Sequence, residues 1–131
     1  MSQENVEIVR RGFGAWSRGD ATALIQGLLD PDVLLQVDQA GQGVYRGHEG
    51  AMESLVGWTE DFDDFRVVPE EFLDNDDYVV VRTRQTGIGK ASGVPMEGLA
   101  WFICQMREGK AIRVHVVVNE QQSLEAAGLS E

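Results

Sequence analysis

The fold is decided by residues 65–118, which read FRVVPEEFLDNDDYVVVRTRQTGIGKASGVPMEGLAWFICQMREGKAIRVHVVV. Turn-forming residues divide this segment into four stretches rich in β-branched and aromatic side chains, as strands are. The predicted strands cover residues 65–73, 78–86, 96–107 and 111–118. The Asp74–Asp77 cluster and the Glu108–Gly109 pair provide tight turns between them. Four consecutive strands joined in this way predict an antiparallel meander.

The residues before this segment predict two helices. Apolar side chains recur at helical spacing from Val6 to Trp16, which predicts an amphipathic first helix that ends at Gly19 and carries Trp16 on its inner face. Asp20 can cap a short second helix, which stops before Pro31 because the residue before a proline avoids helical torsions. We therefore expect a helical hairpin at the start of the chain.

One more strand and one more helix complete the first half. Residues 33–38 alternate as a half-buried strand does, and Gly47 precedes a third helix. Asn119 can cap a closing helix that ends at Gly128. The order helix, helix, strand, helix, strands separates helices from sheet, which argues for an α+β fold. With 131 residues and no linker or repeat, residues 1–131 are expected to form a single domain.

The amino-acid composition limits the classes of molecule that the chain is expected to bind. The formal net charge of −11 repels phosphate backbones and anionic membranes, so we expect no nucleic-acid and no membrane partner. No apolar run is long enough to span a bilayer, and no secretory signal is visible. Cys104 is the single cysteine, which excludes an internal disulfide and fits a reducing, cytoplasmic location. We expect Cys104 to be a small buried hydrophobe.

A set of phrases carries a family resemblance. They are RRGFGAWSRGD at Arg10–Asp20, DPDV at Asp30–Val33, YRGHEG at Tyr45–Gly50, GVP at Gly93–Pro95, REGK at Arg107–Lys110 and LEAAGL at Leu124–Leu129. Over essentially the whole chain, the sequence resembles SnoaL-like proteins of the nuclear transport factor 2-like superfamily. The resemblance implies a cone of helices packed on a strongly curved, mostly antiparallel sheet, a pocket inside it, and commonly a homodimer through the outer sheet face.

The resemblance does not imply one reaction, because the superfamily includes polyketide cyclases, ketosteroid isomerases, epoxide hydrolases, dehydratases and non-catalytic binders. Its steroid isomerases use a tyrosine on the first helix, an aspartate base after the first strand and a second aspartic acid in the sheet. In this sequence Gly12 occupies the tyrosine position and Phe102 lies near that of the second acid. Asp38 falls within one residue of the base.

Asp38 and His115 are the candidate catalytic residues, and each could transfer a proton. Asp38 matches the isomerase base position, although a carboxylate at a strand end is more often solvated. His115 alternates with Arg113 and Val117 on the last strand, and its ordinary pKa suits acid/base chemistry, although a lone histidine among valines is more often structural. Asn119 shares the His115 face. The sequence does not decide which face of this strand meets the pocket.

Further residues are predicted to bind the ligand. An apolar pocket of this kind would hold a small apolar or polycyclic ligand. His48 opens the third helix, where a capping role competes with binding. The complete predicted binding set is Trp16, Tyr45, His48, Met52, Trp58, Arg84, Phe102, Val117 and Asn119. If Phe102 faces the cone, then Leu99, Trp101 and Ile103 face outward and form an apolar stripe suited to dimerisation.

Our leading hypothesis is a SnoaL-like small-molecule-binding protein. In one version of this hypothesis the protein is a cofactor-independent lyase, isomerase or cyclase that uses Asp38 or His115 for proton transfer. The alternative is a non-catalytic ligand carrier or dimeric adaptor. A third hypothesis, epoxide hydrolysis, rests on the fold and on Arg82 and Arg84, which share one strand face but have no acid beside them in the sequence. We expect no metal and no cofactor, because the two histidines lack ligands at metal spacing.

Overall fold

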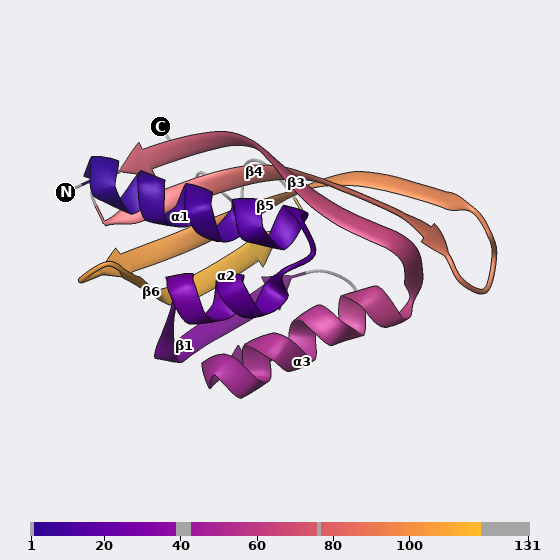
Figure 1. Ribbon diagram of the computed structural model, residues 1–131, viewed down its shortest axis with the longest axis horizontal. Coiled ribbons are helices and arrows are strands. Elements are labelled where there is room, and N and C mark those ends of the chain that lie inside the picture. Colours follow the sequence, from indigo (N-terminus) through magenta and orange to yellow (C-terminus); the bar gives the residue numbers. More distant parts are fainter. Residues whose placement is uncertain (1, 39–42, 76, 119–131) are drawn as a thin grey trace.

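Three helices lie on one face of a six-stranded sheet in the computed structural model, which describes residues 2–38, 43–75 and 77–118 (Figure 1). The helices are α1 (Ser2–Ser17), α2 (Ala21–Leu28) and α3 (Gly47–Glu60). The strands are β1 (Leu29–Asp38), β2 (Val44–Arg46), β3 (Phe62–Asn75), β4 (Tyr78–Gly89), β5 (Pro95–Arg107) and β6 (Lys110–Val117). This arrangement confirms the α+β prediction. None of the described helices is long and apolar enough to span a membrane.

The helical hairpin forms as predicted. The Asp20 side chain accepts a hydrogen bond from the Ala23 amide at 3.0 Å and so caps α2. Gly12 faces α2 so closely that an added Cβ would lie 3.2 Å from Leu28 Cβ. This close approach explains a glycine inside α1, where glycine otherwise costs about 1 kcal/mol relative to alanine.

The sheet has the strand order β2-β1-β6-β5-β4-β3. Strands β3 to β6 pair antiparallel with their sequence neighbours, which confirms the predicted meander. Strand β1 pairs antiparallel with β2 and parallel with β6. The short strand β2 and the parallel pair were not predicted from the sequence. The predicted closing helix from Asn119 lies outside the described residues.

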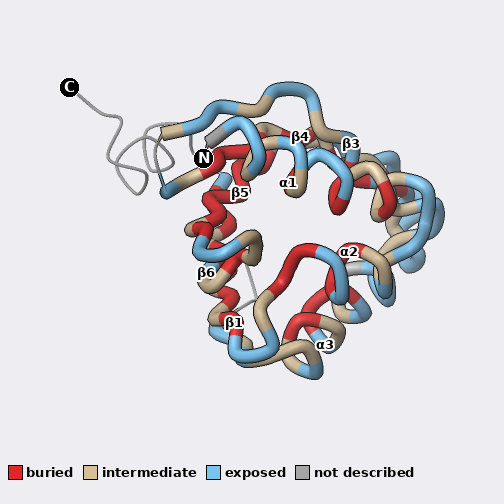
Figure 2. Tube along the Cα trace, turned by 60° about the vertical axis from the view of Figure 1, so that its left-hand side comes forward, coloured by how far each residue is buried: buried red, intermediate tan, exposed pale blue. Residues whose placement is uncertain are grey.

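Buried residues divide between the two faces of the sheet. Under the helices, Val9, Phe13 and Leu28 pack with inward residues of β1, β4, β5 and β6, and Figure 2 shows the buried stretches of β1, β5 and β6. On the opposite face, a second cluster consists of Val80, Trp101, Ile103 and Val117, with Tyr78 packed against it. We call this second set the outer-face cluster.

The outer-face cluster corrects part of the predicted apolar stripe. Trp101 and Ile103 lie on the face opposite Phe102, as the alternation requires, but they are only 8% and 3% exposed within one chain. Leu99, Val68 and Leu73 remain exposed, and their strand register places them on the same outer face. The apolar surface available there is therefore carried by these smaller residues rather than by Trp101.

Candidate functional site

A small cavity lies in the apolar interior between the helices and the sheet. Its volume is about 40 Å³. It is lined from all three helices and from three strands by Phe13, Trp16, Leu24, Leu28, Leu29, Leu35, Ala51, Ser54, Leu55, Phe102, Cys104 and Val114. Of the residues predicted to bind a ligand, Trp16 and Phe102 line this cavity.

Three aromatic rings form one wall of the cavity. The Phe13 and Phe102 ring centroids lie 5.1 Å apart with planes at 77°, and those of Trp16 and Phe102 lie 5.8 Å apart at 87°. Phe13 and Trp16 complete the set at 5.9 Å. The two edge-to-face contacts of Phe102 are favourable beyond the area that they bury. They hold Trp16, the last aromatic residue of α1, against the sheet.

The cavity has few polar groups. Among its described lining residues, only Ser54, Cys104 and the indole of Trp16 have a polar atom in the side chain. None of these side chains contains a carboxylate, an imidazole or an amine. Burial raises the pKa of the Cys104 thiol to about 12, so the group stays a neutral thiol at physiological pH. The described part of the lining therefore provides no group that titrates near neutrality.

The two proton-transfer candidates lie together, on the other face of the sheet. The His115 Nε2–H donates to Asp38 Oδ2 at 2.7 Å. Neighbouring Val114 and Val116 belong to the core under the helices, whereas His115 pairs in register with Ile103 of the outer-face cluster. The sheet thus separates this pair from the cavity.

The local environment of Asp38 is set by its hydrogen bonds. The bond from His115 is the main cause that lowers the pKa of the Asp38 carboxyl, against a smaller raising effect of burial. A weaker bond from Gln36 at 3.4 Å acts in the same direction as His115. Sequence reasoning considered the two residues separately and missed the pair, because its members are 77 residues apart and meet only through the parallel β1–β6 pairing.

The remaining predicted binding residues are dispersed. His48 donates from Nε2 to the Leu29 carbonyl at 2.8 Å, which ties the start of α3 to β1. Tyr45 and Met52 pack partly against the core and also line an open groove beside α3. Val117 belongs to the outer-face cluster. The Trp58 side chain and Asn119 lie outside the described part of the chain.

Arg84 also lies on the outer face, between two acids that only the tertiary structure brings to it. It donates to Glu70 at 2.8 Å and to Glu97 at 2.7 Å, and these carboxylates raise the pKa of its guanidinium. Arg82 lies 3.6 Å from Glu70 and 3.7 Å from Glu71. Arg84 on β4 thus lies between acids of β3 and β5, but this group is partly exposed on the outer face rather than enclosed with a substrate.

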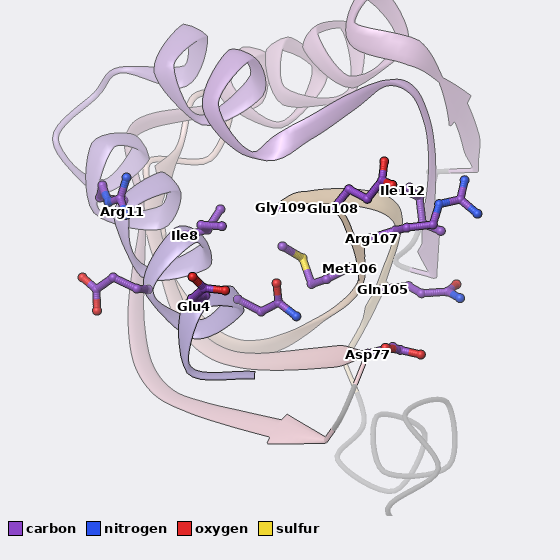
Figure 3. Close-up of a pocket in the computed structure, with 12 residues that line it drawn as sticks. Glu4, Ile8, Arg11, Asp77, Gln105, Met106, Arg107, Glu108, Gly109 and Ile112 are labelled. Atoms are coloured by element: carbon purple, nitrogen blue, oxygen red, sulfur yellow. The ribbon is translucent and has the colours of Figure 1, made fainter. Parts of the chain in front are cut away.

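Two larger hollows open to solvent. One, of about 690 Å³, lies where the end of α1 and the start of α2 approach Thr59 of α3 and the first half of β3. We call it the outer cleft. The other, of about 960 Å³, lies between the N-terminal half of α1 and the β5–β6 turn (Figure 3). Charged side chains such as Glu4, Arg11 and Arg107 line this second groove.

Comparisons with known proteins identify one family from the sequence and one fold from the structure. The sequence profile described as a SnoaL-like domain matches residues 9–114. No curated protein matches the chain significantly in sequence.

Among solved structures, TerC, co-crystallised with polyporic acid, is similar at 22% identity and a TM-score of 0.78, covering 95% of this chain and 98% of TerC. Bal32a, from a soil-derived mobile gene cassette, is similar at 20% identity and a TM-score of 0.79, covering 95% of this chain and 96% of Bal32a. A protein from Catenulispora acidiphila with a ketosteroid isomerase-like fold, in complex with trimethylamine, is similar at 18% identity and a TM-score of 0.75, covering 95% of this chain and 94% of that chain. At these identities the likeness shows the fold alone.

Proposed function

Because this chain belongs to the SnoaL-like domain family, in which one fold serves many activities, we propose its function from the site itself: it binds a small apolar molecule in the helix-covered cavity without catalysing a reaction there. The observation that carries the proposal is the chemistry of the lining. Aromatic and aliphatic side chains from six elements surround the cavity, and its described lining contains no acid or base that titrates near neutrality. General acid/base catalysis needs such a group within hydrogen-bond reach of the substrate.

Two solved relatives in fold support a ligand in this class of domain. TerC was co-crystallised with polyporic acid, and the Catenulispora acidiphila protein with trimethylamine. Both are small molecules, but they differ widely in size and charge. They therefore support small-molecule binding for this chain without specifying one ligand.

The size of the cavity sets a condition on binding. An apolar cavity of about 150 Å³ accepts benzene, so the volume of about 40 Å³ found here is too small for an aromatic ring. A ligand larger than a few atoms requires a wall side chain to move. Binding should accordingly be accompanied by a change around the cavity wall.

Ligand binding can be tested with N-phenyl-1-naphthylamine, whose fluorescence rises in an apolar site, and with toluene followed by NMR. Ala51→Leu would fill the cavity from α3, and we expect it to abolish binding of both probes. Val56→Leu is the matched control, because Val56 lies on the exposed side of the same helix. Failure of both probes to bind the wild type, or binding unaffected by Ala51→Leu, would refute the proposed function.

We also propose that the chain forms a homodimer through the outer sheet face. Exposed Leu99, Val68 and Leu73 beside the outer-face cluster support this association.

We further propose a cytoplasmic location, because the single cysteine fits a reducing compartment. Cell fractionation can check this location.

A further inference from the structure

One aromatic side chain lines both the cavity and the outer cleft. Trp16 is the residue that the described linings of the two have in common. Its ring meets Phe102 on the cavity side at 5.8 Å, and its own exposure is intermediate rather than buried. Among the described residues, Trp16 therefore borders both ends of a path from the cleft to the cavity.

The position of Trp16 in the chain favours a partition that can move. It lies in the last turn of α1, one residue before the helix ends at Ser17, and Gly19 follows with a φ of +92°. Its ring meets Phe102 edge-to-face and Phe13 at a tilt of 60°. By contrast, the other rings of the aromatic wall, Phe13 and Phe102, are 2% and 4% exposed and are held in the core.

The two compartments differ in chemistry. The cavity is apolar, whereas the outer cleft is lined by Ser17, Arg18, Thr59, Asp64 and Arg66 as well as by Trp16. Neither Arg18 nor Arg66 forms an ion pair with any residue that the structure describes. Two arginines face one aspartate here, in a chain of net charge −11. The cleft therefore has a local excess of positive charge and is suited to bind an anionic group.

We propose that Trp16 is a movable partition, and that the ligand of this protein is an apolar molecule with an acidic group that spans both compartments. Displacement of the indole joins the cavity to the cleft. The apolar body then lies among the cavity side chains, and the acidic group lies in the cleft beside Arg18 and Arg66. This inference rests on the proposed function, because it assumes that the cavity binds a ligand.

The acidic group is tested with two probes that differ by one sulfonate, 8-anilinonaphthalene-1-sulfonate and neutral N-phenyl-1-naphthylamine. We expect the sulfonate to bind the wild type about fivefold more tightly at low salt, the range of one exposed charge pair. Arg18→Gln should remove this preference. Arg107→Gln is the matched control, because Arg107 lines the groove at the opposite end of α1, and it should leave the preference unchanged.

The partition is tested by the association rate of the neutral probe in stopped-flow fluorescence. Trp16→Leu should raise this rate by about tenfold, because no indole has to move. Leu35→Ala enlarges the cavity without touching the cleft, so it should leave the rate near the wild-type value. Thermal unfolding by circular dichroism confirms that each variant is folded, and Trp16→Phe provides a milder change if Trp16→Leu does not fold.

The outcomes separate the two proposals. If neither probe binds the wild type, the proposed function fails. If the neutral probe binds and Ala51→Leu abolishes its binding, the proposed function stands. In that case, equal rates for Trp16→Leu and Leu35→Ala overturn the partition, and equal affinity of the wild type for the two probes overturns the acidic ligand.

Discussion

His115 donates a hydrogen bond of 2.7 Å to Asp38 across the parallel strands β1 and β6, on the face of the sheet opposite the cavity. Each residue is a reasonable candidate for catalysis when the sequence is considered alone. Together they form a partly exposed pair whose surroundings are the outer-face cluster and solvent. We therefore expect the pair to stabilise the fold rather than to act in the cavity, and its contribution to stability can be measured.

The Asp38–His115 pair should make stability depend on pH. The pKa of Asp38 is lowered in the folded chain, so its contribution is present above the ordinary aspartate pKa of 3.8 and is lost as the pH falls through the lowered value. Because the Asp38 side chain is 40% exposed, we expect Asp38→Asn to cost less than about 1 kcal/mol at pH 7. Urea unfolding at pH 7 and pH 3 measures the difference, which should shrink at pH 3.

Asp63→Asn is the control for this comparison, because Asp63 is an exposed residue of β3. A cost of Asp38→Asn that is equal at both pH values, or equal to that of Asp63→Asn, would contradict the stabilising role of the pair.

Probe binding should not need His115. Because the sheet separates its side chain from the cavity, we expect His115→Gln to bind N-phenyl-1-naphthylamine with the wild-type affinity. Fluorescence titration at pH 7 provides the measurement. A loss of about tenfold or more in affinity would place His115 in the binding site and would contradict its separation from the cavity.

A charged substitution at Leu99, rather than at Trp101, should test the dimer interface. Leu99 is 36% exposed on the outer face, whereas Trp101 is 8% exposed, so a charge at position 101 would destabilise the monomer itself. We expect Leu99→Glu to weaken self-association in sedimentation velocity without lowering the melting temperature substantially. Val56→Glu is the control, since Val56 is similarly exposed but lies on α3. A dimer that survives Leu99→Glu would place the interface elsewhere.

The single cysteine should report unfolding. Cys104 is completely buried, and burial raises its pKa to about 12, so the reactive thiolate is scarce in the native chain. We expect 5,5′-dithiobis-(2-nitrobenzoate) to label it only as the chain opens, and immediately in guanidinium. Rapid labelling of the native protein would show that the cavity region opens readily, whereas bound ligand should slow the labelling further.

Two glycines should respond oppositely to alanine. Gly47 has a φ of +71°, and an added Cβ would lie 3.2 Å from the Pro31 carbonyl oxygen, so Gly47→Ala should cost at least about 1 kcal/mol. Gly57 lies inside α3 with nothing within 4 Å of an added Cβ, so Gly57→Ala should stabilise by about 1 kcal/mol. Thermal unfolding of the two variants gives the comparison. A stabilising Gly47→Ala would contradict the left-handed backbone at the start of α3.

The sequence by itself determined the local elements and placed two aromatic residues of the cavity wall, Trp16 and Phe102. Helical spacing placed Trp16 on the inner side of α1, the Asp20 cap formed as predicted, and the turns after β3 and β5 produced the meander. Alternation placed Phe102 and Trp101 on opposite faces of β5. These features depend on neighbours a few residues away, so a local pattern contains the information that sets them.

Only the tertiary structure decided which face of the sheet the helices cover. Alternation along β6 separates His115 from Val114 and Val116, but it is equally compatible with helices on either side, and only the packing of α1, α2 and α3 assigns the inner face. The parallel β1–β6 pairing, which joins His115 to Asp38, and the β3–β4–β5 register, which places Arg84 between Glu70 and Glu97, likewise depend on contacts between distant segments. Such contacts are fixed by the burial of the whole core, because no short stretch of sequence specifies its partner strand.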